Sequence, residues 1–87
     1  RIMARNKQGH ISEQYQEVRD ALLLVLHKCK DPYAKSYASA GLESWRIQDE
    51  AGLKTQVLYV IGNVGGWRGE IARKAKKVLR AFTSELI

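Results

Sequence analysis

The chain has 87 residues, a formal net charge of +6 and a single cysteine, Cys29. This length predicts one domain, and a single cysteine excludes an intrachain disulfide. The longest apolar run, Ala21 to Leu26, is far shorter than the ~20 residues that a membrane-spanning helix needs. With 45% hydrophobic and 28% charged residues, the composition is that of a folded protein, and we expect a cytoplasmic location.

The N-terminal residues 1–11 show no hydrophobic periodicity, so we expect a flexible basic arm followed by a single helical domain over residues 12–87. Ser12 is a suitable N-cap for a first helix. Apolar residues at spacings of three and four from Tyr15 to Cys29 predict that helix. Pro32 ends it, because the residue before a proline is disfavoured in helical geometry.

Asp31 and Pro32 also predict the start of a second helix, with an aspartate N-cap and proline in the first helical position. We expect this helix to be short and capped by Gly41. Glu43 to Arg46 then form a connection, which makes Trp45 a candidate exposed anchor for a partner.

A third helix is predicted from Ile47 onward, with Asp49 and Glu50 in its first turn. The segment VLYVI (residues 57–61) is also rich in strand-forming residues, so a strand remains the alternative. Helix is favoured because no second segment of similar quality is present to pair with a strand. The glycines near residues 62–66 are the clearest break in the chain.

The last helix is predicted to start near Trp67. Its expected apolar face consists of Trp67, Ile71, Ala75, Val78, Leu79 and Phe82. The four segments together predict an all-α fold, a compact bundle of about four helices with a flexible basic N-terminal arm.

Basic residues concentrate in the last helix. Residues 68–80 contain six of the fifteen Lys and Arg residues and one acid, Glu70. Helical spacing places Arg73, Lys76, Lys77 and Arg80 on one face, where they are suited to neutralise phosphates, and Arg68 at the helix start adds a bidentate donor. The arm residues Arg5 and Lys7 extend the candidate set. The alternative is that these side chains form an ordinary solvated surface, in which the helix dipole favours positive charges near the C-terminal end of the helix.

More specific nucleic-acid motifs fit poorly. The link GNVGG contains more glycine than the usual three- or four-residue turn of a helix-turn-helix, and the start of the last helix offers few base-reading side chains. The glycines lack the Gly-Lys-Ser or Gly-Lys-Thr of a phosphate loop. We interpret this segment as a helix–helix turn with close packing at Gly69, and Trp67 as a packing residue.

Nothing in the sequence predicts an enzyme. His27 and Cys29 are two residues apart on a helix and point to different faces, so they do not share a metal. No serine or carboxylate pair forms a recognisable catalytic pattern. We expect no catalytic residue, no cofactor and no metal site.

The segment from Leu53 to Leu79 resembles small proteins encoded by bacteriophages and related mobile elements. The matching features are Gln56, Leu58-Tyr59-Val60, Asn63, Trp67-Arg68-Gly69-Glu70, Ala72, Lys77 and Leu79. The resemblance covers less than a third of the chain. It implies a bacterial or viral cytoplasmic origin and assigns no site residue.

The sequence therefore predicts a non-enzymatic binding module that contacts nucleic-acid phosphates without sequence specificity. A phage-type protein-interaction module or inhibitor, docking on an acidic protein surface or self-associating, is the alternative. A membrane partner is not expected, and homodimer formation is left open.

Overall fold

The computed structural model describes residues 13–84. These residues form four α-helices, namely α1 (Glu13–Lys28), α2 (Pro32–Arg46), α3 (Glu50–Asn63) and α4 (Glu70–Ser84), and residues 13–84 contain no strand. The predicted all-α bundle of about four helices is confirmed, and residues 57–61 are helical. The predicted arm, with Arg5 and Lys7, lies outside the described residues.

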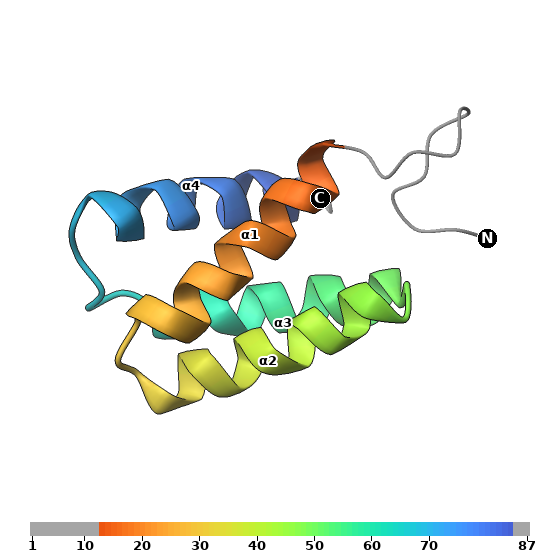
Figure 1. The fold of residues 1–87 in the computed structure, drawn as a ribbon, viewed down its shortest axis with the longest axis horizontal. Coiled ribbons are helices and arrows are strands. Elements are labelled where there is room, and N and C mark those ends of the chain that lie inside the picture. Colours follow the sequence, from red (N-terminus) through yellow and green to blue (C-terminus); the bar gives the residue numbers. More distant parts are fainter. Residues whose placement is uncertain (1–12, 85–87) are drawn as a thin grey trace.

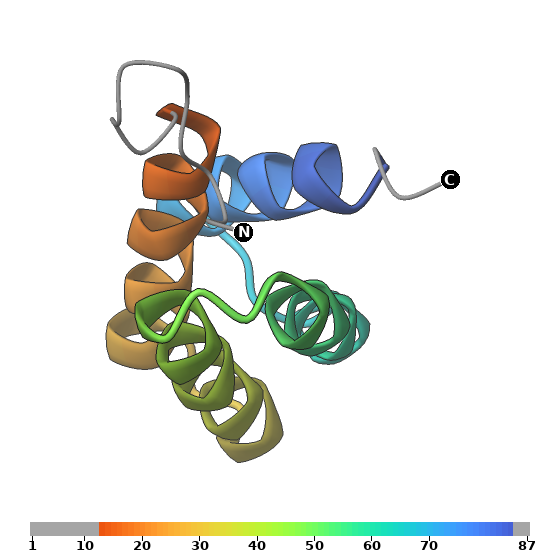
Figure 2. The same ribbon diagram turned by 90° about the vertical axis from the view of Figure 1, so that its right-hand side faces the viewer.

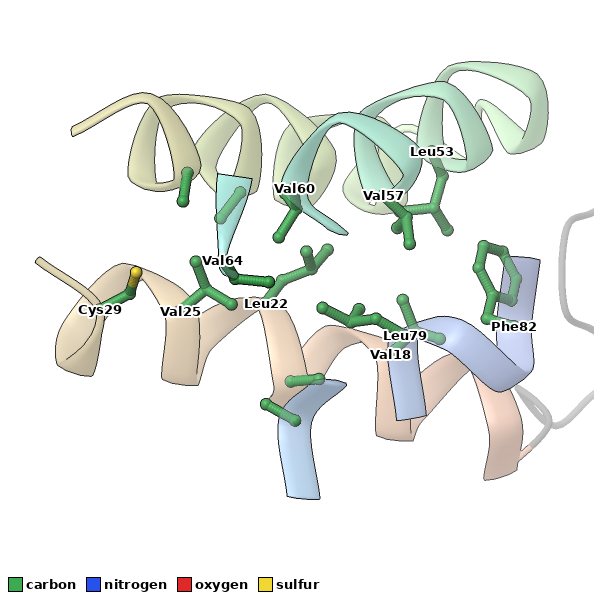
Figure 3. Packing of buried hydrophobic residues seen from close by; sticks show 14 residues of the cluster. Val18, Leu22, Val25, Cys29, Leu53, Val57, Val60, Val64, Leu79 and Phe82 are labelled. Carbon is green, nitrogen blue, oxygen red and sulfur yellow. The ribbon is translucent and has the colours of Figure 1, made fainter. Parts of the chain in front are cut away.

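The helices form two layers. Helices α2 and α3 lie side by side in one layer, and α1 packs against both α2 and α4 (Figures 1 and 2). The close-up in Figure 3 shows α1 and α4 on one side of the apolar core and α2 and α3 on the other. The α1–α2 turn and the α3–α4 loop lie at the same end of the bundle (left in Figure 1).

The core is aliphatic, with one aromatic ring. Leu22, Leu53 and Leu79 are completely buried, and Phe82 lies at one end of the row of core side chains (Figure 3). Full burial of such a side chain stabilises the fold by about 1.5–3 kcal/mol relative to leaving it exposed. The other core residues are Val18, Ala21, Val25, Cys29, Ala34, Ala38, Val57, Val60, Val64 and Ala75.

Aspartate side chains begin two of the helices. Asp31 accepts hydrogen bonds from the backbone N–H groups of Tyr33 and Ala34, and Pro32 follows it, as predicted. Asp49 accepts from the N–H of Gly52 at 3.0 Å. A Cβ on Gly52 would collide with that carboxylate, so the glycine leaves room for the cap.

The predicted end of the second helix was wrong. Gly41 is buried inside α2, where a Cβ would lie 3.1 Å from Cδ1 of Leu22. The glycine allows α2 to approach α1 closely and does not cap a helix. Residues 43–46 are therefore the last turn of α2 and not a connection.

The predicted start of the third helix at Ile47 was also wrong. Ile47 is the C-cap of α2 and is 55% exposed, while Asp49 is the N-cap of α3. One short turn therefore ends one helix and begins the next.

The apolar face of α4 differs from the prediction by one position. Ala72 is buried, whereas Ile71 is 44% exposed and Val78 is only half-buried. The helix begins at Glu70 and not at Trp67. The prediction placed Ile71 on the buried face because isoleucine is the more hydrophobic residue. The structure buries Ala72 there, because a small side chain allows close packing between helices.

Candidate anion-binding groove

The α3–α4 loop, residues 64–69, is anchored at several points. Val64 is buried, and the backbone N–H of Trp67 donates to the Val64 carbonyl oxygen at 3.0 Å. The Trp67 side chain is half-buried and packs against the core, as predicted. These contacts hold the loop in one conformation. With six residues, the loop is longer than the turn of three or four residues that joins the helices of a helix-turn-helix.

Gly69 ends this loop with a φ of +112°, a backbone conformation that only glycine adopts readily. Its carbonyl oxygen accepts the hydrogen bond from the N–H of Arg73 that opens α4. The expectation of close packing at Gly69 was wrong, because a Cβ there would meet nothing within 4 Å. The glycine serves the turn of the backbone that starts α4.

Lys76 fastens the loop to α4. Its ammonium group donates a hydrogen bond to the Trp67 carbonyl oxygen, nine residues earlier in the chain. The side chain is half-buried, whereas Arg68, Arg73, Lys77 and Arg80 are exposed. Lys76 thus positions the loop, and the other four side chains remain available to a ligand.

The loop and the outer face of α4 line an open groove of about 590 Å³, called the basic groove from here on. The structure brings five of the predicted site residues together in it: Arg68, Arg73, Lys76, Lys77 and Arg80. Gly65, Trp67 and Gly69 are the remaining lining residues in the part of the chain that the structure describes, so no acid among residues 13–84 lines the groove. Arg5 and Lys7, the other two predicted residues, lie outside the described residues.

The positive charges of the basic groove have no acidic partner within residues 13–84. Ion pairs do form elsewhere in that range, between Arg19 and Asp20 at 3.2 Å and between Lys54 and Glu50 at 3.7 Å. Five cations around one hollow create a strongly positive potential. Such a surface attracts a ligand with several negative charges, such as a chain of phosphates.

Arg46 behaves differently from the groove residues. Its guanidinium pairs with Glu43 one turn earlier on α2, with Nε donating to Oε1 at 3.1 Å. That hydrogen bond lowers the pKa of Glu43 and raises the pKa of Arg46. This arginine already has an anionic partner and is exposed outside the groove.

Trp45 is not the exposed anchor that the sequence suggested. It lies in the last turn of α2, is half-buried, and packs against the core. Its indole N–H donates to the Tyr15 carbonyl oxygen at 3.0 Å, and the Arg19 guanidinium lies 5.4 Å from the ring centroid. These contacts connect α2 to α1, so we do not propose Trp45 as a partner site.

Among residues 13–84, no group of three His, Cys, Asp or Glu side chains lies closely enough together to hold a metal ion. Cys29 is buried and His27 is exposed.

None of the helices among the described residues is long and apolar enough to cross a lipid bilayer.

A second hollow, of about 750 Å³, lies beside the basic groove and was not predicted from the sequence. The residues that line it include Lys28, Lys30 and Tyr33 from around the α1–α2 turn, and Trp67 and Arg68 from the α3–α4 loop. Lys28 and Lys30 also lie at or just beyond the C-terminal end of α1, where the helix dipole favours positive charges. The sequence did contain a signal for the proximity of the two connections. In a bundle of four helices that run alternately up and down, the first and third connections lie at the same end.

Searches against protein-family models, curated proteins and solved structures find no match to this chain.

Proposed function

We propose that this chain is a non-enzymatic module that binds nucleic acid through its phosphates, in the basic groove. The observation that carries the proposal is the gathering of five cations in one groove, with no acid among the described residues that line it. Arg68, Arg73, Lys77 and Arg80 are exposed and lack an ion-pair partner within the described range. Arginine favours phosphate because its planar group donates two parallel hydrogen bonds.

The mode of binding follows from the side chains present. Contacts from arginine and lysine to phosphates position a protein on nucleic acid but carry no sequence information. Base reading is done mainly by Asn, Gln or Arg side chains near the start of a recognition helix. The first three residues of α4, Glu70, Ile71 and Ala72, include none of these, and the cations that follow form a row along the helix that suits successive phosphates, so we propose binding that depends strongly on salt and weakly on sequence.

The test measures fluorescence anisotropy of labelled DNA and RNA oligonucleotides at about 50 and about 200 mM salt, because phosphate contacts weaken as salt rises. A groove variant carries Arg73→Gln, Lys77→Gln and Arg80→Gln, and leaves Lys76 in place to hold the loop. A matched control variant carries Lys35→Gln, Arg46→Gln and Lys54→Gln, none of which lines the groove. Both variants lose three positive charges.

We expect the groove variant to bind more weakly and to reduce the slope of log affinity against log salt by about 2–3, since each lost phosphate contact removes about 0.9. The control variant should keep most of the affinity and slope. Absence of binding at about 50 mM salt would sink the proposal. So would equal losses in the two variants, or equal affinity for poly-glutamate, which would favour a carboxylate-rich protein partner.

A further inference from the structure

We infer that the nucleic acid is single-stranded and that one of its bases stacks on Tyr33. This inference rests on the proposed function and assigns a role to the second hollow. Trp67 and Arg68 line both the second hollow and the basic groove, so the two form one continuous surface. A strand that leaves the phosphate-binding face of α4 therefore meets the α1–α2 turn next.

Tyr33 differs from the other aromatic residues between positions 13 and 84. Tyr37 and Tyr59 pack on each other with ring centroids 5.1 Å apart, and Tyr15 packs on Phe82 at 5.4 Å. Trp45 and Trp67 pack against the core. The Tyr33 ring has no ring or hydrogen-bond partner in this range, and the residue is 67% exposed, the largest value among the exposed large hydrophobic residues.

The backbone that carries this ring is held in place at the start of a helix. Tyr33 is the second residue of α2, and its N–H donates to Oδ1 of Asp31 at 2.8 Å. Pro32 restricts the backbone just before it. An exposed ring on a rigid helix start loses little conformational entropy when a base stacks on it.

The charges around Tyr33 suit a phosphate backbone. Lys28, Lys30 and Arg68 line the same hollow. Asp31 is the one acid among the described residues that line this hollow, and its carboxylate already accepts hydrogen bonds from two backbone N–H groups at the start of α2. Three cations beside an exposed ring are the arrangement by which proteins hold single strands, with bases stacked on aromatic rings and phosphates on cations.

A duplex cannot use this surface in the same way. Its bases are stacked on one another inside the helix, so an aromatic ring reaches a base face only where a strand is unpaired. The basic groove alone would serve a duplex and a single strand equally. The Tyr33 ring is the feature that favours the single strand.

The test compares a 12-nucleotide single strand with the duplex of the same sequence at about 50 mM salt, where phosphate contacts are strongest. Tyr33→Ala should weaken single-strand binding by about 5- to 100-fold, the range for one lost stacked base. Duplex binding should change by less than about twofold. Tyr33→Phe should bind like the wild type, and Tyr33→Leu like Tyr33→Ala, because leucine keeps the bulk but not the flat ring.

An oligonucleotide with abasic positions gives an independent readout, because it keeps every phosphate but offers fewer bases to stack. The wild type and Tyr33→Ala should bind a fully abasic strand equally. If Tyr33→Ala leaves single-strand affinity unchanged, or weakens single strand and duplex alike, the stacking role is overturned while phosphate binding stands. If neither nucleic acid binds the wild type, the proposed function itself fails.

Discussion

Gln48 adopts a backbone conformation that is costly for its residue type. Its φ is +62°, and Gln48 is the one non-glycine residue with positive φ between positions 13 and 84. Its N–H donates to the Trp45 carbonyl oxygen, and the N–H of Asp49 donates to the Ser44 carbonyl oxygen at 2.8 Å. This pair of bonds is the Schellman motif, which ends α2 and in which glycine usually takes the left-handed position.

Replacing Gln48 by glycine should therefore stabilise the protein. The left-handed conformation costs an L-residue about 1–2 kcal/mol, and the larger entropy of glycine in the unfolded chain offsets part of this. We expect Gln48→Gly to raise the free energy of unfolding by about 0.5–1 kcal/mol in urea titrations followed by circular dichroism. Gln48→Ala, the control, should show no gain, and a Gln48→Gly protein less stable than the wild type would contradict this reading of the turn.

At the level of helices, Gly41 sets how closely α1 and α2 approach. A Cβ at this position would lie 3.1 Å from Leu22 Cδ1 and 3.4 Å from Gln56 Cβ, so neighbours on both α1 and α3 leave little space. Gly62 offers a matched comparison, because it lies in a helix, is exposed, and has nothing within 4 Å of an added Cβ.

Gly41→Val should lower the free energy of unfolding by about 1–3 kcal/mol, because overpacking pushes the helices apart. Gly62→Val should change it by less than about 0.5 kcal/mol, since valine has a slightly better helix propensity than glycine. Thermal and urea denaturation of both variants provide the measurement. Equal stability of the two variants would show that the α1–α2 contact is not tight at Gly41.

Local signals predicted the elements whose causes are local. Asp31-Pro32 and the glycines of residues 62–66 correctly marked the start of α2 and the break after α3. The end of α2 was missed because its left-handed residue is Gln48, while Gly41, the nearest glycine, serves helix packing. A sequence does not distinguish a packing glycine from a capping one until the neighbouring helix is known.

The candidate site was likewise predictable only where its arrangement depends on spacing within one helix. Helical spacing alone placed Arg73, Lys77 and Arg80 on one face, which the structure retains. Spacing within one helix could not reveal that Lys76 holds the loop through the Trp67 carbonyl oxygen, or that Lys28 and Lys30 lie near Arg68. Those relations depend on how separate segments pack together.

For the molecule as a whole, the basic groove that we propose as a binding surface is also expected to lower the stability of the fold. Residues 73, 76, 77 and 80 form four like-charge pairs at helical spacings of three and four. Each such pair destabilises a helix by roughly 0.2–0.5 kcal/mol. Because no acid among residues 13–84 lines the groove, counterions or an anionic ligand would relieve this repulsion.

The stability of the free protein should therefore rise with salt. Between about 0.05 and 0.5 M sodium chloride, screening should raise the free energy of unfolding by about 1 kcal/mol, the sum of the four repulsive pairs. The groove variant Arg73→Gln, Lys77→Gln, Arg80→Gln should have a higher Tm than the wild type at low salt and a smaller salt dependence. The control variant Lys35→Gln, Arg46→Gln, Lys54→Gln loses two ion pairs and should not gain stability.

Thermal denaturation of the three proteins across this salt range makes the measurement. A Tm that falls with salt, or a groove variant less stable than the control variant, would contradict this prediction. Either result would mean that the groove cations stabilise the fold. The expected outcome joins stability to function, because the variant that binds nucleic acid most weakly would also be the most stable. Such a trade is typical of residues retained for binding and not for folding.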